Sequence, residues 1–267
     1  MVHPQPDREL LFPAQTYLIP WARAMFMEHG KTLLTSHNSN RTLVIMAKAP
    51  RPGMVKTRLA QSLPVEAVAE LYRCLLDDTV ALAHSLPSVK VAIMCPASDA
   101  NELALLAGDR TAVVAQQGRG LAAGLTSVFA HFAANDPQHV VAFNSDSPHL
   151  PVSVLASAFE TLNAHDLVVG PTHDGGYYLV GSKAPHASLF HADGMGTDSA
   201  LDGLLARAQK LHLSVGFTDS FYDIDEGSDL TRLAEELRLA PERAPRTAAW
   251  LKRQEPTPRL RSASGDL

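Results

Sequence analysis

The stretch that decides the fold is residues 42–59, TLVIMAKAPRPGMVKTRL. It opens with a short run of apolar and β-branched residues, which is typical of a strand buried on both faces. Pro50, Pro52 and Gly53 follow and prevent a helix, so the strand runs into a shaped loop. The loop carries cations and no acid: Lys48, Arg51, Lys56 and Arg58.

Such a loop favours phosphate binding, because backbone amides in a turn and several Lys or Arg side chains together neutralise phosphate oxygens. It is not a P-loop, since no Gly-Lys-Ser/Thr follows at the required spacing. The alternative interpretation is an exposed loop that is basic by chance. Its position directly after a strand, with both Pro and Gly, favours the phosphate interpretation.

The rest of the chain alternates strand-like and helix-like segments. Further short apolar runs predict strands over 89–95, 111–115, 140–143, 167–170 and 177–180. Residues 64–85 carry apolar side chains at three- and four-residue spacing, and further helix candidates cover 100–107, 121–133, 152–162, 199–208 and 228–239. Ser228 is a candidate N-cap for the last of these. This alternation predicts an α/β protein with a mostly parallel central sheet and helices on both faces.

Composition excludes several classes of protein. The chain has 267 residues, 46% of them hydrophobic, and a formal net charge of −5. The apolar fraction is too high for a disordered chain, and no apolar run reaches the roughly 18 residues of a membrane span. The negative charge argues against nucleic-acid binding through a general basic surface. Cys74 and Cys95 lack metal-ligand spacing and suggest no disulfide framework, which predicts a cytoplasmic location.

We expect one folded domain over residues 41–240. A proline-broken, partly flexible extension over residues 1–40 precedes it. A Pro/Arg-rich tail over residues 241–267 follows it and is either solvated or forms a short helix around Trp250. The opening residues lack a basic segment followed by an apolar one, so no signal peptide is predicted. A homodimer is compatible with the sequence because homodimers are common among oligomers, but no residue pattern in the sequence indicates one.

A single acidic residue follows a later strand in the segment NSDSPHL, residues 144–150. An Asp at the carboxyl end of a strand, here Asp146, is suited to binding Mg²⁺ or Mn²⁺. Asp and Ser are equally suited to capping the helix that follows, so both interpretations stay open. In α/β sheets, ligands bind at the carboxyl ends of the strands, and Asp146 and the basic loop both lie there.

Two further motifs add carboxylates near strand ends. Asp174, Gly175 and Gly176 lie between two predicted strands, where they form either a plain hairpin turn or a close approach to a ligand. Asp223 and Asp225 share one side of an extended segment, because side chains alternate with period two. These two carboxylates either bind a divalent cation opposite Asp146 or cap the helix that follows.

The segment QGRGLAAG, residues 117–124, does not match a dinucleotide-binding fingerprint, because its last glycine comes one residue late. A flexible loop facing a ligand at a helix N-terminus remains a reasonable interpretation, and it includes Gln117 and Gly118. Residues 194–198, GMGTD, form another loop, in which Thr197 is a candidate for lining an acceptor pocket.

Taken together, these motifs resemble the rSAM/selenodomain-associated transferase 1 family, a DUF2064-type group within the GT-A-like superfamily of nucleotidyltransferases and nucleotide-diphospho-sugar transferases. The resemblance covers about residues 42–239 and rests on AKAPRPGMVKTRL (47–59), NSDSPHL (144–150), GPTHDGGYYLVG (170–181) and YDIDEGSDL (222–230). The loop at 117–124 lacks the acidic residues that the family usually carries there.

The resemblance implies a Rossmann-like GT-A architecture and a role for each motif. Lys56, Arg58 and Asp146 are the implied catalytic residues, and Mg²⁺ or Mn²⁺ is the implied cofactor. Its metal ligands are implied to be Asp146 with Asp225 or Asp223. The implied nucleotide-binding residues are Ala47, Lys48, Gly53, Lys56, Arg58, Gln117 and Gly118. Those implied on the acceptor side are Asp174, Gly175, Gly176 and Thr197.

Two enzymatic functions follow from this resemblance. The first is nucleotidyl transfer from a nucleoside triphosphate to a small phosphorylated acceptor, with release of pyrophosphate. The second is glycosyl transfer from a nucleotide-diphospho-sugar. Sugar transferases of this fold usually present an Asp-x-Asp metal pair, whereas residues 144–146 read Asn-Ser-Asp, and the basic loop suits a triphosphate. We therefore favour nucleotidyl transfer, and a nucleotide-binding module without turnover is a third possibility.

Overall fold

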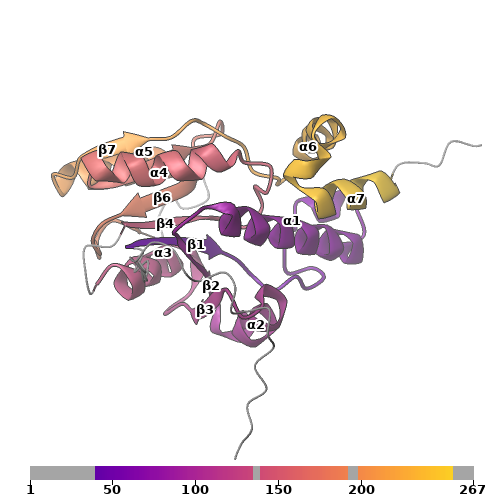
Figure 1. Cartoon of the computed structure of the whole chain (residues 1–267), viewed down its shortest axis with the longest axis horizontal. Coiled ribbons are helices and arrows are strands. Elements are labelled where there is room, and N and C mark those ends of the chain that lie inside the picture. Colours follow the sequence, from indigo (N-terminus) through magenta and orange to yellow (C-terminus); the bar gives the residue numbers. More distant parts are fainter. Residues whose placement is uncertain (1–39, 135–138, 192–197, 255–267) are drawn as a thin grey trace, which may run out of the picture. The chain divides into compact units, whose positions relative to one another are not determined.

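The computed structural model describes residues 40–134, 139–191 and 198–254 (Figure 1). Nearly all of the predicted N-terminal extension and the end of the predicted tail therefore lie outside the described residues. Within these ranges, no helix is long and apolar enough to cross a membrane. Cys74 and Cys95 are both free thiols.

In the described residues, seven strands form one sheet in the order β3-β2-β1-β4-β6-β5-β7. Strand β6 runs antiparallel to both of its neighbours, and the other pairs are parallel. The short connection over residues 172–176 explains this exception, because only a hairpin joins strands through so few residues. The strands are β1 (Arg41–Met46), β2 (Lys90–Cys95), β3 (Ala112–Ala115), β4 (His139–Asn144), β5 (Leu167–Pro171), β6 (Tyr177–Ser182) and β7 (Val215–Phe217).

Helices cover both faces of the sheet, which confirms the predicted α/β class. One face packs against α1 (Val65–Ser85), α2 (Ala100–Ala107) and α4 (Val152–Ala164). The other face packs against α3 (Gly120–Phe132) and α5 (Ala200–Lys210). Short 3₁₀ turns are η2 (Leu59–Gln61), η3 (Ala97–Asp99) and η4 (Pro241–Arg243).

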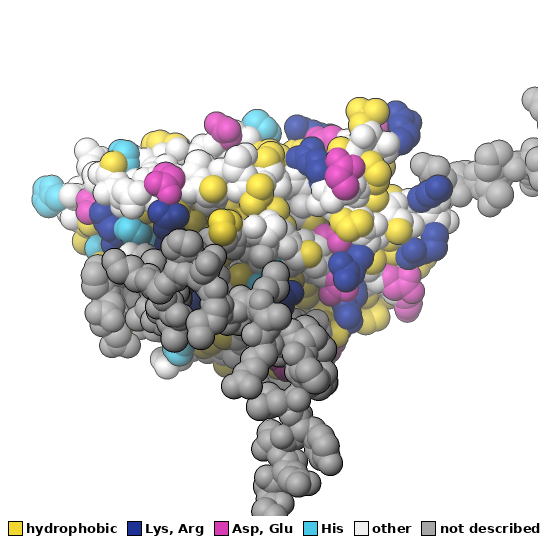
Figure 2. Space-filling view, in the orientation of Figure 1, with side chains coloured by type: hydrophobic (Ala, Val, Ile, Leu, Met, Phe, Trp, Pro, Cys, Tyr) yellow, Lys and Arg dark blue, Asp and Glu magenta, His cyan; other side chains and the backbone are white. Residues whose placement is uncertain are grey.

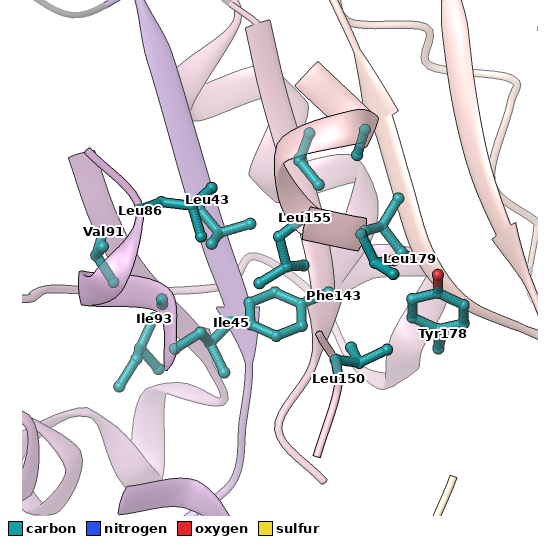
Figure 3. Packing of buried hydrophobic residues seen from close by; sticks show 14 of the residues in the cluster. Leu43, Ile45, Leu86, Val91, Ile93, Phe143, Leu150, Leu155, Tyr178 and Leu179 are labelled. Atoms are coloured by element: carbon teal, nitrogen blue, oxygen red, sulfur yellow. The ribbon is translucent and has the colours of Figure 1, made fainter. Parts of the chain in front are cut away.

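Strand β1 explains why the opening sequence is apolar throughout. Leu43 and Ile45 point into the core on the α1 and α4 side, together with Phe143 and Leu155 (Figure 3). Val44, between them, packs into the core on the α3 and α5 side. Because both faces of a central strand are buried, successive side chains alternate between two apolar environments rather than between core and solvent.

The order of the strands determines where a ligand site lies. From β1 the chain proceeds outward through β2 and β3 and then returns to place β4 on the other side of β1. Met46, at the end of β1, is in register with Asn144, at the end of β4. The loops that follow these two strands therefore leave the sheet side by side at its topological switch point, where open α/β sheets form their binding crevice.

A third group of helices packs beside α1 and extends the folded unit beyond the predicted boundary at Ala240. Helices α6 (Gly227–Leu239) and α7 (Pro245–Gln254) lie alongside α1 (Figure 1). Trp250 of α7 is only 1% exposed. The carboxylate of Asp78, buried in α1, accepts hydrogen bonds from the backbone N–H groups of Arg246 and Thr247 at the start of α7. Of the two interpretations of the tail, the structure therefore shows the short helix around Trp250, and this helix packs into the folded unit.

Two other local expectations differ from the structure. Strand β7 was not predicted, because its short segment has too few apolar residues to show a period. The N-cap of α6 is Glu226 rather than Ser228, and Glu226 and Asp229 form a reciprocal capping box.

The surface around α6 and α7 mixes Lys and Arg with Asp and Glu side chains on the face shown in Figure 2.

Candidate nucleotide-binding site

The loop after β1 is held in place by its own backbone and by α2. Gly53 has φ of +73° and Lys56 has φ of +46°, so the chain turns sharply at both positions. The Arg51 guanidinium donates to Asp99 Oδ1 at 3.0 Å and to Glu102 Oε2 at 2.9 Å. Arg51 therefore fastens the loop to the sheet edge and is not free for phosphate.

Lys56 connects two segments that are far apart in the sequence. Its ammonium is buried between the carboxylates of Asp146, after β4, and Asp225, before α6, with 2.8 Å from Lys56 Nζ to Asp225 Oδ1. Arg58 NH1 lies 3.2 Å from the other Asp225 oxygen. Burial opposes a charge on Lys56, but the two carboxylates outweigh it and raise the pKa of Lys56 above its usual value.

The segment between β7 and α6 alternates as predicted. Tyr222 and Ile224 are buried against α1, α6 and α7, while Asp223 and Asp225 face the site. Asn144 Nδ2 donates to Asp223 Oδ1 at 2.9 Å. Burial and then the neighbouring Asp146 raise the pKa of Asp223 to about 8.

These contacts exclude helix capping, one of the two interpretations that the sequence left open for each of these carboxylates. Helix α4 begins at Val152 after Pro151, so Asp146 does not cap it. The cap of α6 comes from Glu226, so Asp223 and Asp225 are not its N-cap either. All three Asp carboxylates instead gather around Lys56.

A cavity of about 510 Å³ lies over the ends of β1 and β4. Of the predicted nucleotide-binding residues, it is lined by Ala47, Lys48, Lys56 and Arg58, whereas Gly53 acts through the shape of the loop. The exposed apolar side chains of Met54 and Leu121 also line the cavity, together with Gln116, Gly120, Asp146 and Asp225.

The Gly-rich loop contributes different residues from those predicted. Gln117 and Gly118 do not line this cavity, whereas the neighbouring Gln116 and Gly120 do. The Gln116 amide donates to the carbonyl oxygens of Gly118 and Gly120 and thereby shapes the loop before α3. The conformation of this loop decides which of its residues face the cavity, and the sequence gives no signal that distinguishes Gln116 from Gln117.

Tyr72 is a site residue that sequence reasoning missed, because it reads as one more buried position of α1. Its hydroxyl accepts from the Lys48 N–H at 3.1 Å and lies 2.8 Å from Ser145 Oγ. Thr79, about two helical turns further along α1, donates to the Ser145 carbonyl. Helix α1 therefore positions the loops that follow β1 and β4 relative to each other.

A second cavity, of about 310 Å³, adjoins the first and shares Arg58 and Asp225 with it. Asp174 lines it, as predicted for the acceptor side, although its carboxylate also stabilises the turn by accepting from Thr172 Oγ1 and the Gly176 N–H. Gly175 and Gly176 do not line this cavity. Gly175 has φ of +85°, and its position against Asp198 leaves no room for a side chain. Thr197 lies outside the described residues.

The chemistry of the site fits a hard divalent cation. Asp146 Oδ1 is buried without a hydrogen-bond partner among the described residues, and Asp146, Asp223 and Asp225 offer carboxylate oxygens. In the described residues, no three His, Cys, Asp or Glu side chains already converge as a ligand set. One or two carboxylates with the remaining positions filled by water is the usual way in which proteins hold Mg²⁺.

A mostly parallel sheet with a crevice at the ends of β1 and β4 agrees with the GT-A-like architecture that the resemblance implied. Residues 79–197 match the family model DUF2064, described as an uncharacterized protein conserved in bacteria. This match confirms, for that segment, the family that the motifs indicated. No curated protein matches the sequence.

Solved structures support the same fold. A protein from Desulfovibrio desulfuricans G20, described as a "putative nucleotide-diphospho-sugar transferase", is 26% identical, with a TM-score of 0.73 over 80% of this chain and 95% of that chain. The inositol-1-phosphate CTP transferase from T. maritima is 15% identical, with a TM-score of 0.52 over 82% of this chain and 99% of that one. A nucleotidyl transferase from Methanothermobacter thermautotroptrophicus is 17% identical, with a TM-score of 0.51 over 74% and 98%. The first of these agrees with the predicted enzyme class, a transferase, and the other two show the same fold.

Proposed function

We propose that the protein is a metal-dependent nucleotidyltransferase, which moves a nucleoside monophosphate from a nucleoside triphosphate to a small acceptor and releases pyrophosphate. The observation that carries this proposal is the meeting of Lys56 and Arg58 with Asp146 and Asp225 in one cavity at the topological switch point. Phosphoryl chemistry needs such a combination of cations for the phosphates and carboxylates for a metal.

The chain's own residues would mainly bind and orient the substrates. An acceptor oxygen attacks the α-phosphorus, the bond from that phosphorus to the bridging oxygen breaks, and pyrophosphate leaves. Arg58, whose side chain is 58% exposed, is positioned to pair with the departing phosphates, and Lys48 lies at the same rim. Met54 and Leu121 offer an apolar surface suited to the base. A divalent cation held by Asp146 and Asp225 would neutralise charge on the transferred phosphate.

Lys56 has a second role in this proposal. Its ammonium neutralises Asp146 and Asp225 when no other cation is near them. A nucleotide with its metal would offer Lys56 phosphate oxygens in exchange for these carboxylates. Because Lys56 reaches both groups from one loop, nucleotide binding and metal binding should be coupled.

Glycosyl transfer is the second candidate, favoured by the 26% identical protein described as a nucleotide-diphospho-sugar transferase. Two features weigh against it. Asn144 donates its amide to Asp223 and so does not supply the first acid of an Asp-x-Asp pair. The cations of the first loop also suit a triphosphate better than a diphosphate-sugar.

A thermal-shift panel tests the proposal and distinguishes the candidates. ATP, GTP, CTP, UTP and the common UDP-, GDP- and CMP-sugars are each measured with and without Mg²⁺ or Mn²⁺. A ligand at about one hundred times its dissociation constant stabilises the fold by about 2.7 kcal/mol, which is readily measured. We expect a metal-dependent shift from one triphosphate, whereas a shift only from a diphosphate-sugar would establish the second candidate.

Two variants make the assignment specific to these residues. Asp146→Asn keeps the shape of the side chain and should abolish the metal dependence of the shift. Arg58→Ala should weaken triphosphate binding about tenfold, the effect of one charge-assisted contact. Lys210→Ala, at the exposed end of α5, is the matched control and should bind as the unmodified protein does. Unchanged metal dependence in Asp146→Asn would remove the carboxylates from the site.

A further inference from the structure

The second cavity is positioned to receive the acceptor. It lies between the turn at Asp174 and the start of α6, and Arg58 and Asp225 line both this cavity and the nucleotide cavity. A molecule bound there would therefore lie next to the phosphates held by the first loop. A volume of about 310 Å³ falls in the range of small-molecule sites.

The charge of this cavity is mostly negative. Carboxylates outnumber guanidinium groups among its lining residues, which include Asp174, Asp225, Glu226 and Asp229 against Arg58 and Arg232. Binding one divalent cation at Asp146 and Asp225 would not reverse this excess. A phosphate group on the acceptor would therefore meet carboxylate oxygens of the same charge.

Both guanidinium groups are already paired with carboxylates of the protein. Arg58 donates to Asp225 at 3.2 Å. Arg232 donates to Glu236 at 3.2 Å, and its guanidinium carbon lies 3.8 Å from the centre of the Tyr222 ring. A phosphate on the acceptor would therefore compete with these carboxylates for the two guanidinium groups, and Arg58 is needed for the nucleotide in the proposed function.

Hydrogen-bond acceptors, by contrast, remain available in the cavity. Asp223 Oδ1 accepts from Asn144, and Asp229 Oδ2 accepts from the N–H groups of Asp225 and Glu226 at 3.0 and 2.8 Å. Among the described residues, the second oxygen of Asp223 and that of Asp229 have no hydrogen-bond partner in the structure. Asp229 thus offers an unused acceptor, whereas both guanidinium groups already pair with carboxylates of the protein.

We infer that the acceptor, given the proposed function, is an unphosphorylated polyhydroxylated molecule such as a sugar or a polyol, recognised through hydroxyl groups that donate to these carboxylates. This replaces the phosphorylated acceptor expected from the sequence. One hydroxyl oxygen of the acceptor forms the new bond to the α-phosphorus of the nucleotide. Pyrophosphate leaves, and the hydroxyl proton passes to solvent.

The test compares acceptors that differ only in a phosphate group. The full chain is incubated with Mg²⁺ and either the four triphosphates or UDP-glucose. Each mixture receives one member of three pairs: glycerol and glycerol phosphate, glucose and glucose phosphate, or inositol and inositol phosphate. Mass spectrometry of the products and pyrophosphate release report transfer. We expect transfer to an unphosphorylated member, with its phosphorylated partner at least tenfold less effective.

A charge variant connects the preference to the cavity. Asp174→Asn keeps the oxygen that accepts from Thr172 and Gly176 but removes one negative charge. In this variant, the ratio of transfer to the unphosphorylated member over transfer to the phosphorylated member should fall about tenfold, an order of magnitude typical of removing one nearby charge. Asp202→Asn, exposed on α5 and outside the cavity, should leave the preference unchanged.

The possible failures are distinguishable. Suppose that nucleotide binds in the thermal-shift panel. The inference is then wrong, and the nucleotide site stands, if the protein uses only the phosphorylated acceptors, uses both members of each pair equally, or uses none of the acceptors. The inference is also wrong if the Asp174→Asn and Asp202→Asn variants prefer the unphosphorylated acceptor to the same extent. If no nucleotide binds or is consumed, the proposed function fails and the inference fails with it.

Discussion

His149 provides a direct test of the packing that supports the site. Its ring is fully buried, with centroids 4.5 Å from the Tyr222 ring and 5.1 Å from the Phe221 ring. Neither ring nitrogen has a hydrogen-bond partner among the described residues. Burial, followed by the nearby charges of Arg243 and Arg232, lowers the pKa of His149 to about 3.

The consequence for stability has a definite sign. In the unfolded chain a histidine has a pKa near 6.5, so below that pH the unfolded state binds a proton that folded His149 does not. Stability is therefore complete above pH 6.5 and is lost as the pH falls from there toward 3. At about 1.4 kcal/mol per pH unit, this single group costs about 2 kcal/mol at pH 5.

Chemical denaturation at pH 8 and pH 5 measures this loss. His149→Phe retains an aromatic ring but cannot take up a proton, so its stability difference between the two pH values should be about 2 kcal/mol smaller than in the unmodified protein. Any constant packing cost of the variant cancels in this comparison. His131→Phe, at an exposed position on α3, is the control and should leave the pH dependence unchanged. Equal pH dependence in His149→Phe and the unmodified protein would falsify the argument.

Two further predictions concern residues outside the cavities. Asp78→Ala removes a buried carboxylate that accepts two backbone N–H groups and a hydroxyl at the start of α7, so unfolding free energy should fall by about 3 kcal/mol in chemical denaturation. Asp77→Ala, which loses partly exposed ion pairs, should cost below about 1 kcal/mol, and equal losses would contradict the role of Asp78. Gly175→Ala should lower the melting temperature clearly more than Gly53→Ala. Both positions have positive φ, but only at Gly175 would the new Cβ collide with the Asp198 backbone, so similar shifts would contradict this.

Much of the fold was predictable because burial leaves a local period in the sequence. Strand β1 is apolar throughout since both of its faces are covered, and α1 shows the spacing of a helix with one buried face. The connections were also predictable, because Pro restricts and Gly frees the backbone dihedral angles at their own positions in the chain. A short helix around Trp250 was one of two interpretations of the tail, but its packing into the fold could not be predicted, since its burial depends on Asp78 and α1, far away in the chain.

The candidate site divides in the same way. The sequence by itself determined which residue types follow each strand: cations after β1, Asp146 after β4, and alternating carboxylates before α6. Only the tertiary structure decided their partners. Arg51 turned to Asp99, while Lys56 is held between carboxylates that lie 90 and 169 residues away along the chain. A local pattern encodes which side of a segment is buried, but the pairing of distant side chains depends on strand order and helix packing, which no short stretch of sequence contains.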